Sequence, residues 1–222
     1  MLATDTALAA APCANGISGV VYVVDDDDSV RDSLELLLRS IDLQVDVFRS
    51  AEEFLAAPKS AGPACLVLDV RLRGQSGLAL HKSLLTKERA PLPVVFMTGY
   101  ADIAMTVEAM KAGAMDFLTK PFRDQDMIDA VIAALQRDAR RVEADSSLID
   151  ARRRWDALTP REREVLINVA SGLMNKQIAA RMRIAEVTVK IHRGQAMRKM
   201  NVRSVADLVR QVVALGVDPG GQ

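Results

Sequence analysis

The chain has 222 residues, of which 50% are hydrophobic, and its 29 basic residues balance 29 acidic ones. This length accommodates one or two domains with ordinary apolar cores. The two cysteines, Cys13 and Cys65, form no CxxC pair and have no His cluster nearby, which argues against a disulfide framework or a structural zinc site and suits a reducing cytoplasm. No apolar run approaches the roughly 18 residues that a membrane span needs.

The zero net charge hides an asymmetry along the chain. Residues 1–150 contain 15 basic and 23 acidic residues, a balance of −8, whereas residues 151–222 contain 14 basic and 6 acidic residues, a balance of +8. An acidic part joined to a basic part indicates two domains with different partners, and the basic one is suited to nucleic acid.

Residues 1–18 are rich in alanine and lack a basic start, so we expect a disordered N-terminal tail rather than a signal peptide. From residue 19, short β-rich runs alternate with helical patterns. Ser50 and Glu53 form a capping box at the start of the second helix. Alternation of strand and helix predicts a doubly wound, five-stranded parallel α/β sheet. The expected strands are Val20–Val24, Gln44–Phe48, Cys65–Asp69, Val94–Thr98 and Met115–Thr119.

The fifth helix is expected to start near Asp124 and to continue through the charged stretch Arg137–Arg154, which contains neither Gly nor Pro. We therefore predict a helical linker over residues 139–156. The apolar residues Leu135, Val142 and Ile149 are spaced seven positions apart, and this spacing is also compatible with a short coiled-coil contact.

Beyond Trp155 the pattern is purely helical. Thr159-Pro160-Arg161-Glu162 predicts a helix start, with Thr as N-cap, Pro in the first turn and Glu three residues after the cap. Asn175 is expected to cap a second helix, a third covers Glu186–Met200, and Ser204 with Asp207 starts a fourth. The prediction is a compact, all-α four-helix domain.

Chemistry in a doubly wound sheet gathers at the carboxyl ends of the strands. At these ends the sequence places Asp25, Asp26, Asp69, Thr98 and Lys120. Three clustered carboxylates repel one another unless a cation lies between them, and Mg²⁺ prefers such oxygen ligands. One carboxylate can then act as a nucleophile towards phosphorus, while the hydroxyl and the ammonium stabilise the transferred group. An acidic run alone is more often a solvated helix start, but the combination at four strand ends favours function.

The stretches VYVVDDDDSVRDSL, CLVLDVRL, VVFMTGYAD and MKAGAMDFLTKPF resemble the receiver domain of response regulators of the FixJ/NarL type, a flavodoxin-like domain, over residues 19–138. The resemblance implies that Asp69 is the phospho-acceptor and that Asp25, Asp26 and the backbone carbonyl of Arg71 bind Mg²⁺ with it. It further implies that Thr98 binds the phosphoryl group and that Lys120 pairs with it. Phe117 is implied to be the aromatic residue whose rotamer reports the conformational switch. The Lys120–Pro121 bond is cis in this family.

Two features depart from the receiver pattern. Arg73 stands where the family usually has proline, four residues after the acceptor, which leaves the shape of the loop before Gly77 open. The acidic run extends over Asp25–Asp28, so the register of the metal site can slip by one residue. We place the site at Asp25 and Asp26 because the first strand ends at Val24.

The segments Asn175–Met182 and Glu186–Met200, with a break at Arg183–Ala185, have the dimensions of a helix-turn-helix. A helical wheel puts Val189, Ala196 and Met200 on the core face, with Val187 on the opposite face. Lys190, Ile191 and Gln195 are candidates to contact bases. The candidates to contact phosphates are Lys176, Thr188, Arg198 and Lys199. The candidate DNA-binding residues are Lys176, Thr188, Lys190, Ile191, Gly194, Gln195, Arg198 and Lys199.

The stretches LTPREREVL, GLMNKQIA, AEVTVKIHRGQAMRKM and NVRSVADLV resemble the LuxR-type output domain of the same family, and we expect this domain over residues 157–217. Ala185 stands where the family often has a capping Ser, which weakens the helix start by about 1 kcal/mol. Gly194 offers no side chain to the groove. The alternative to a DNA-binding domain is a purely structural four-helix bundle with a solvated basic face.

The histidines show no metal-ligand spacing. His81 is expected at the surface or in a satisfied core, and His192 at the border between core and groove. Trp155 is expected to pack against the second domain rather than on a base.

These features together predict a cytoplasmic two-component regulator of transcription. A sensor histidine kinase would phosphorylate Asp69, and phosphorylation would favour a homodimer that binds promoter DNA, with RNA polymerase as a further partner. We expect no turnover enzyme, because Arg71 occupies the position where aspartyl-phosphate hydrolases place a second acid. Two alternatives stay open: such a phosphohydrolase, and a phosphorylation-independent DNA-binding protein whose receiver is a dimer scaffold.

Overall fold

A computed structural model describes residues 18–74, 76–87, 92–99 and 103–218. The predicted disordered tail and Cys13 thus fall outside the described residues, except for residue 18. The chain separates into two compact units, Met1–Val142 and Glu143–Gln222. Each unit has its own hydrophobic core.

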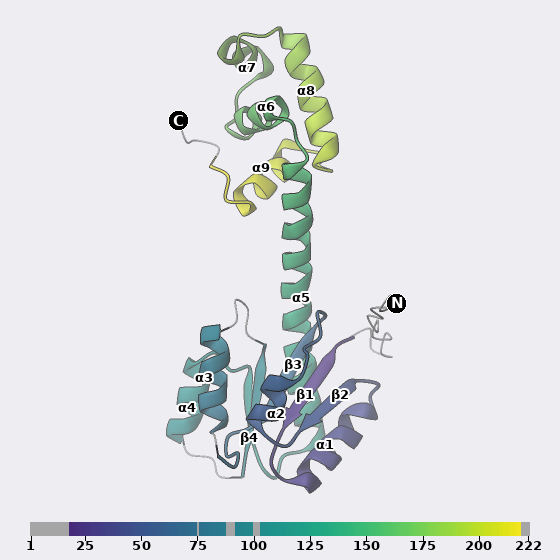
Figure 1. The fold of residues 1–222 in the computed structure, drawn as a ribbon, viewed down its shortest axis with the longest axis vertical. Coiled ribbons are helices and arrows are strands. Elements are labelled where there is room, and N and C mark those ends of the chain that lie inside the picture. Colours follow the sequence, from purple (N-terminus) through teal and green to yellow (C-terminus); the bar gives the residue numbers. More distant parts are fainter. Residues whose placement is uncertain (1–17, 75, 88–91, 100–102, 219–222) are drawn as a thin grey trace, which may run out of the picture. The chain divides into compact units, whose positions relative to one another are not determined.

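The first unit contains a five-stranded sheet in the order β2-β1-β3-β4-β5 (Figure 1), and every neighbouring pair is parallel. The inner strands β1, β3 and β4 are buried along their whole length, as expected for apolar strands that are covered on both faces. This confirms the predicted doubly wound α/β fold. The strands are β1 (Val20–Val24), β2 (Gln44–Phe48), β3 (Ala64–Asp69), β4 (Val94–Thr98) and β5 (Asp116–Thr119).

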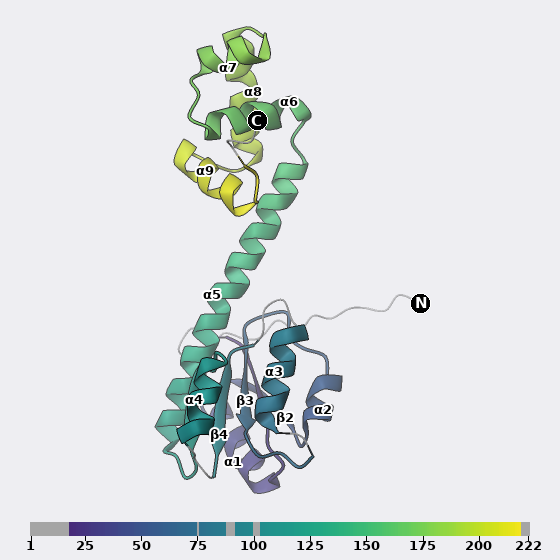
Figure 2. The same ribbon diagram turned by 90° about the vertical axis from the view of Figure 1, so that its left-hand side faces the viewer.

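Helices cover both faces of this sheet (Figure 2). Because strand side chains alternate in direction, Val21 and Val23 join the core beneath α1 and α5, while Tyr22 and Val24 join the core beneath α2, α3 and α4. The Ser50 hydroxyl caps α2 by accepting the Glu53 N–H at 3.2 Å, which confirms half of the predicted capping box. The other half is wrong, because the Glu53 carboxylate accepts the N–H of Arg49 at 2.9 Å and not that of Ser50. The helices are α1 (Asp28–Arg39), α2 (Ala51–Ala56), α3 (Gly77–Lys87), α4 (Ile103–Lys111) and α5 (Asp124–Asp156).

Helix α5 starts at Asp124, as expected, and continues to Asp156 without interruption, so the predicted helical conformation of residues 139–156 is confirmed. Leu135 is fully buried in the core of the first unit, whereas Ile149 is 54% exposed. The seven-residue repeat therefore does not mark one uninterrupted coiled-coil seam, because Leu135 already packs against the sheet. Within the described ranges, no helix is long and apolar enough to cross a membrane.

The second unit packs four helices around a core that includes Trp155 and Leu158. The predicted capping box of α6 is present, with Thr159 as N-cap and Glu162 as its partner. Ser204 caps α9 by accepting a hydrogen bond from the Asp207 N–H at 3.0 Å, also as predicted. These helices are α6 (Pro160–Ala170), α7 (Asn175–Met182), α8 (Glu186–Lys199) and α9 (Val205–Ala214).

The expected cap of α7 is wrong. The N-cap is Met174, whose N–H donates to the Gln177 side chain at 2.8 Å, and Asn175 is the first residue inside the helix. The side-chain Oδ1 of Asn175 instead accepts a hydrogen bond from the guanidinium of Arg193 of α8 at 3.0 Å. Asn175 therefore links the two helices of the helix-turn-helix rather than starting one of them.

Candidate functional site

The carboxyl ends of four strands bring polar side chains to one edge of the sheet. Asp25 follows β1 and Asp69 ends β3, and both are buried, with 1% and 7% exposure. Thr98 ends β4 and is fully buried. Lys120 follows β5, and its backbone N–H donates to the Thr98 carbonyl at 2.8 Å. The edge that the sequence analysis singled out is thus assembled as one cluster.

Lys120 is the centre of this cluster. Its Nζ lies 2.6 Å from Oδ2 of Asp25 and 2.7 Å from Oδ2 of Asp69. Burial lowers the pKa of Lys120, but its hydrogen bonds to the two carboxylates outweigh burial, so the pKa is raised above its ordinary value. The Lys120–Pro121 peptide bond is cis, as expected. Because its pKa is raised, the Lys120 ammonium stays positively charged between the two carboxylates at neutral pH.

The two buried carboxylates are also held by backbone groups. Oδ1 of Asp25 accepts the N–H of Asp27 at 2.9 Å, and Oδ1 of Asp69 accepts the N–H of Arg71 at 2.8 Å. Burial raises the pKa of Asp25, against the lowering effect of Lys120 and the Asp27 N–H. These contacts fix both carboxylates in orientation, so the side chains are preorganised for chemistry at their remaining lone pairs.

The four consecutive acids Asp25–Asp28 have different structural roles. Asp27 is the N-cap of α1, where its side chain accepts the N–H groups of Ser29 and Val30. Asp28 lies in the first turn and pairs with Arg31. Oxygen atoms of Asp25, Asp26 and Asp69, in contrast, all lie within 4.8 Å of one another. Three hard oxygen ligands at this spacing fit a divalent cation such as Mg²⁺.

A cavity of about 620 Å³ opens over these carboxylates. Its wall includes Lys120, Gly99 and Arg73, and the Nε of Arg73 lies 2.8 Å from Oδ2 of Asp26. The sequence does not predict the shape of the loop that carries Arg73. It closes through a bridge between Arg71 and Ser76, so the site retains its cavity without the usual proline.

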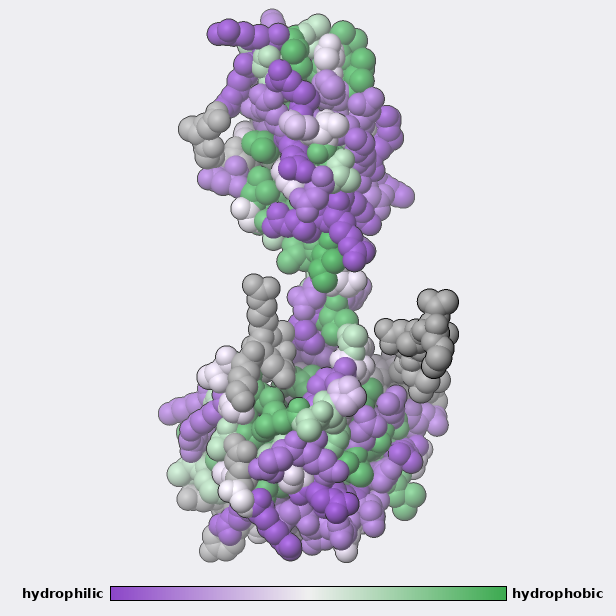
Figure 3. All heavy atoms as spheres, in the orientation of Figure 1, coloured by the Kyte–Doolittle hydropathy of each residue, from purple (hydrophilic) through white to green (hydrophobic). Residues whose placement is uncertain are grey.

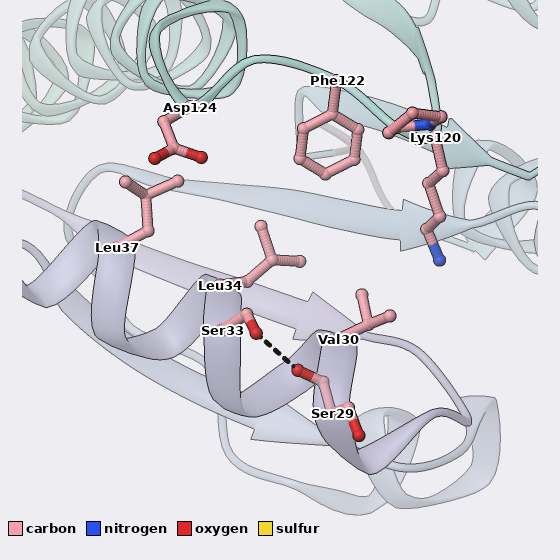
Figure 4. Close-up of a pocket in the computed structure, with 9 residues that line it drawn as sticks. Ser29, Val30, Ser33, Leu34, Leu37, Lys120, Phe122 and Asp124 are labelled. Carbon is pink, nitrogen blue, oxygen red and sulfur yellow. Dashed lines mark hydrogen bonds between the residues drawn. The ribbon is translucent and has the colours of Figure 1, made fainter.

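Lys120 also lines a second cavity, of about 340 Å³. Figure 4 shows Val30, Leu34 and Leu37 of α1 directed towards Phe122, with Asp124 at the start of α5. Ser33 also lines this cavity, and its hydroxyl donates a hydrogen bond to the Ser29 carbonyl at 2.7 Å. An apolar depression therefore adjoins the acidic cluster.

Phe117 of β5 is half-buried and belongs to the core beneath α3 and α4. Its ring centroid lies 6.4 Å from that of Phe96, which in turn makes an edge contact with His81 at 5.4 Å. His81 is 2% exposed, so of its two expected positions the core is confirmed and the surface is wrong. Its Nδ1 has no hydrogen-bond partner among the described residues, so the expected satisfaction of the ring is not met at that atom. Burial lowers the pKa of His81.

In the second unit, α7 and α8 are joined by a turn in which Arg183 is left-handed, with φ of 54°. The expected core residues of α8, Val189, Ala196 and Met200, are all fully buried. On the opposite side Val187 and Ile191 are 62% and 54% exposed. The face of this unit visible in Figure 3 is mostly hydrophilic, with small apolar areas.

The candidate DNA-binding side chains are not equally available. Lys176, Gln195 and Arg198 are exposed, and Lys190 is exposed beside Glu186 at 3.2 Å. Thr188 and Gly194 are half-buried. Lys199 forms an ion pair of 2.7 Å with the buried Glu162, which the sequence analysis did not anticipate. Five of the other candidates are thus exposed on the helix-turn-helix, and three of these five, Lys176, Lys190 and Arg198, are basic.

Comparison with known proteins decides the family. The model of the response regulator receiver domain matches residues 21–132, and that of the bacterial regulatory proteins of the luxR family matches residues 156–212. The chain belongs to the response regulators with a LuxR-type DNA-binding domain. This response regulator is therefore a two-component transcription factor, a class whose partners are a sensor kinase and DNA.

Full-length relatives share this architecture. Nodulation protein W of Bradyrhizobium diazoefficiens is 50% identical over 198 residues, which cover 89% of this chain and 87% of the relative. The transcriptional regulatory protein FixJ of Azorhizobium caulinodans is 43% identical, with 90% and 94% covered. Among solved structures, the response regulator StyR matches with a TM-score of 0.78 and 46% identity, over 88% of this chain and 98% of StyR.

Proposed function

We propose that Asp69 is the phospho-acceptor of this response regulator and that a sensor histidine kinase is the donor. The observation that supports this most strongly is the bridging ammonium of Lys120, which pairs Asp69 with Asp25 beneath an open cavity. The proposed domains are a receiver over residues 19–138, a helical linker over 139–156 and a DNA-binding domain over 157–217.

The proposed metal is Mg²⁺, held by Asp25, Asp26, Asp69 and the backbone carbonyl of Arg71. The donor set supports it, since all three side chains are hard oxygen ligands gathered within 4.8 Å. When bound, a divalent cation neutralises negative charge on the transferring phosphoryl group.

In the proposed reaction, one Asp69 oxygen attacks the phosphorus of a phosphohistidine. A P–O bond forms as the P–N bond breaks, and the imidazole nitrogen leaves with the electron pair of that bond. Lys120 and the Thr98 hydroxyl then stabilise the charge on the phosphoryl oxygens. Because Lys120 loses part of its pairing with the modified Asp69, its ammonium is available to the new phosphoryl group.

We propose that this change in charge shifts Thr98 and Phe117 and favours a homodimer. The energetic requirement is that phosphoryl contacts differ between the two conformations by a few kcal/mol. A dimer would present two copies of α8 to a two-fold related promoter site, where RNA polymerase would be a further partner. Because promoter DNA is its target, the proposed location is the cytoplasm.

Base contacts are proposed for Lys190, Ile191 and Gln195, with Gly194 allowing close approach of α8 to the groove. Phosphate contacts are proposed for Lys176, Thr188, Arg198 and Lys199. The exposed position of most of these side chains supports the proposal, and the ion pair of Lys199 with Glu162 makes Lys199 the weakest member of the set.

The experiment that tests this function measures DNA affinity with and without acetyl phosphate, for the full-length protein and for Asp69→Asn. We expect the phosphodonor to raise the affinity of the wild type only. Equal affinity in all four samples would instead favour a phosphorylation-independent regulator with the receiver as a scaffold. Sustained hydrolysis of a small phosphate ester would contradict our proposal that this receiver is not a turnover enzyme.

A further inference from the structure

Arg73 extends from the loop between β3 and α3 towards the acidic cluster. Gly74, with φ of 92°, turns the chain directly after Arg73, and the bridge between Arg71 and Ser76 closes the loop. The side chain of Arg73 is 89% exposed, yet its Nε lies 2.8 Å from Oδ2 of Asp26. It also lines the cavity that contains Asp69.

As a result, each of the three carboxylates in the cluster forms an ion pair with a basic side chain. Lys120 pairs with Asp25 and Asp69, and Arg73 pairs with Asp26. Each carboxylate that would hold the divalent cation therefore already contacts a cation of the protein itself. A proline at position 73, as in the usual family pattern, would supply no charge to Asp26.

We propose that Arg73 competes with the divalent cation for Asp26 and so raises the metal concentration at which the site fills. The inference rests on the proposed metal site. An exposed ion pair stabilises a fold only weakly, but the competition has a second cause, because the guanidinium also repels the double charge of the incoming ion. Since arginine stays protonated throughout the physiological pH range, this competition does not depend on pH there.

The test is direct titration of the full-length protein with MgCl₂ by isothermal calorimetry, which requires no phosphodonor. We expect Arg73→Gln to bind Mg²⁺ about threefold to tenfold more tightly than the wild type. Arg73→Lys keeps the charge and should stay within about twofold of the wild type. Arg39→Gln is the matched control, because Arg39 is an exposed, ion-paired arginine at the end of α1 that lies outside the cavity.

The outcomes separate this inference from the function on which it rests. If the wild type and Arg73→Gln both bind no Mg²⁺, the proposed metal site itself is wrong. If both bind with equal affinity, or if Arg73→Gln binds more weakly, the metal site stands and the competition is refuted. An equal gain in Arg39→Gln would also refute it, because the effect would then be one of net charge. Unfolding midpoints of all variants, measured without metal, verify that each is folded.

Discussion

The ammonium of Lys199, the last residue of α8, lies 2.7 Å from Oε2 of Glu162, a carboxylate in the first turn of α6 whose side chain is 3% exposed. The same oxygen accepts the N–H of Thr159 at 2.8 Å. One buried carboxylate thus caps α6 and fixes the end of α8. A Lys199 that contacts DNA phosphate would have to leave this partner.

This ion pair predicts an acid-sensitive second unit. The hydrogen bond with Lys199 holds the pKa of Glu162 below its ordinary value of 4.5, so its contribution to stability is present above that value and is lost as the pH falls through the lower, folded-state pKa. Glu162→Gln should reduce stability at pH 7 by about 1 kcal/mol and flatten the acid dependence. Fluorescence of Trp155, the single tryptophan, reports unfolding of this core. An unchanged pH dependence would contradict the assignment.

The buried carboxylate of Asp138 on α5 predicts a strong stability effect in the first unit. It is fully buried, and it accepts hydrogen bonds from the Ala64 N–H at 2.9 Å and the Arg141 Nε at 2.7 Å. Asp138→Ala should destabilise the unit by about 2–4 kcal/mol, because the strand N–H and the guanidinium lose their partner. Urea unfolding followed by circular dichroism measures this loss. The exposed neighbour Glu143→Ala is the control, and a similar loss in both variants would argue against a specific role.

Gly77 is required by a close approach to the backbone of Asp69. A Cβ built at Gly77 would lie 2.1 Å from the backbone carbonyl oxygen of Asp69. Gly77→Ala should therefore cost roughly 2–3 kcal/mol of stability and displace Asp69, with slower phosphorylation by acetyl phosphate. Gly62→Ala is the matched control, since its Cβ would meet only the Ser60 hydroxyl at 3.5 Å. Normal stability of Gly77→Ala would show that the loop can shift at little cost.

Lys190 and Arg198 are expected to differ in the kind of DNA contact that they make. Lys190→Ala should weaken binding to the specific site by about 1–3 kcal/mol while changing non-specific binding less. Arg198→Ala should weaken both about equally and reduce the salt dependence, as a phosphate contact does. Fluorescence anisotropy with specific and scrambled duplexes at several salt concentrations distinguishes them. Equal losses of Lys190→Ala on both duplexes would reassign Lys190 to the backbone.

Much of the fold could be predicted because local signals and burial agree. The strands β1, β2 and β4 have the predicted ends, because apolar runs mark β1 and β4 and alternating polar and apolar residues mark β2. The caps at Ser50, Thr159 and Ser204 follow from residues three positions apart. The prediction of Asn175 as N-cap of α7 was wrong because the N-cap is Met174, whose N–H donates to the Gln177 side chain. Methionine is not among the residues favoured at an N-cap, so the sequence does not indicate it.

The parts that could not be predicted are contacts across the fold. Nothing in the charged stretch of α5 distinguishes Asp138 from its exposed neighbours until the sheet places Ala64 beside it. The partners of Arg73 and Lys199 are equally remote in sequence. The strand-end acids, in contrast, could be placed because the carboxyl edge of a parallel sheet gathers them.

The most direct test of phosphorylation at Asp69 is mass spectrometry of the full-length protein after incubation with acetyl phosphate and Mg²⁺. We expect one phosphoryl group per chain, located on the peptide that contains Asp69, and none on Asp69→Asn or in the presence of excess chelator. Asp46→Asn, an acid on β2 outside the cluster, should be labelled like the wild type. Labelling of Asp69→Asn to the wild-type extent would contradict the assignment of the acceptor.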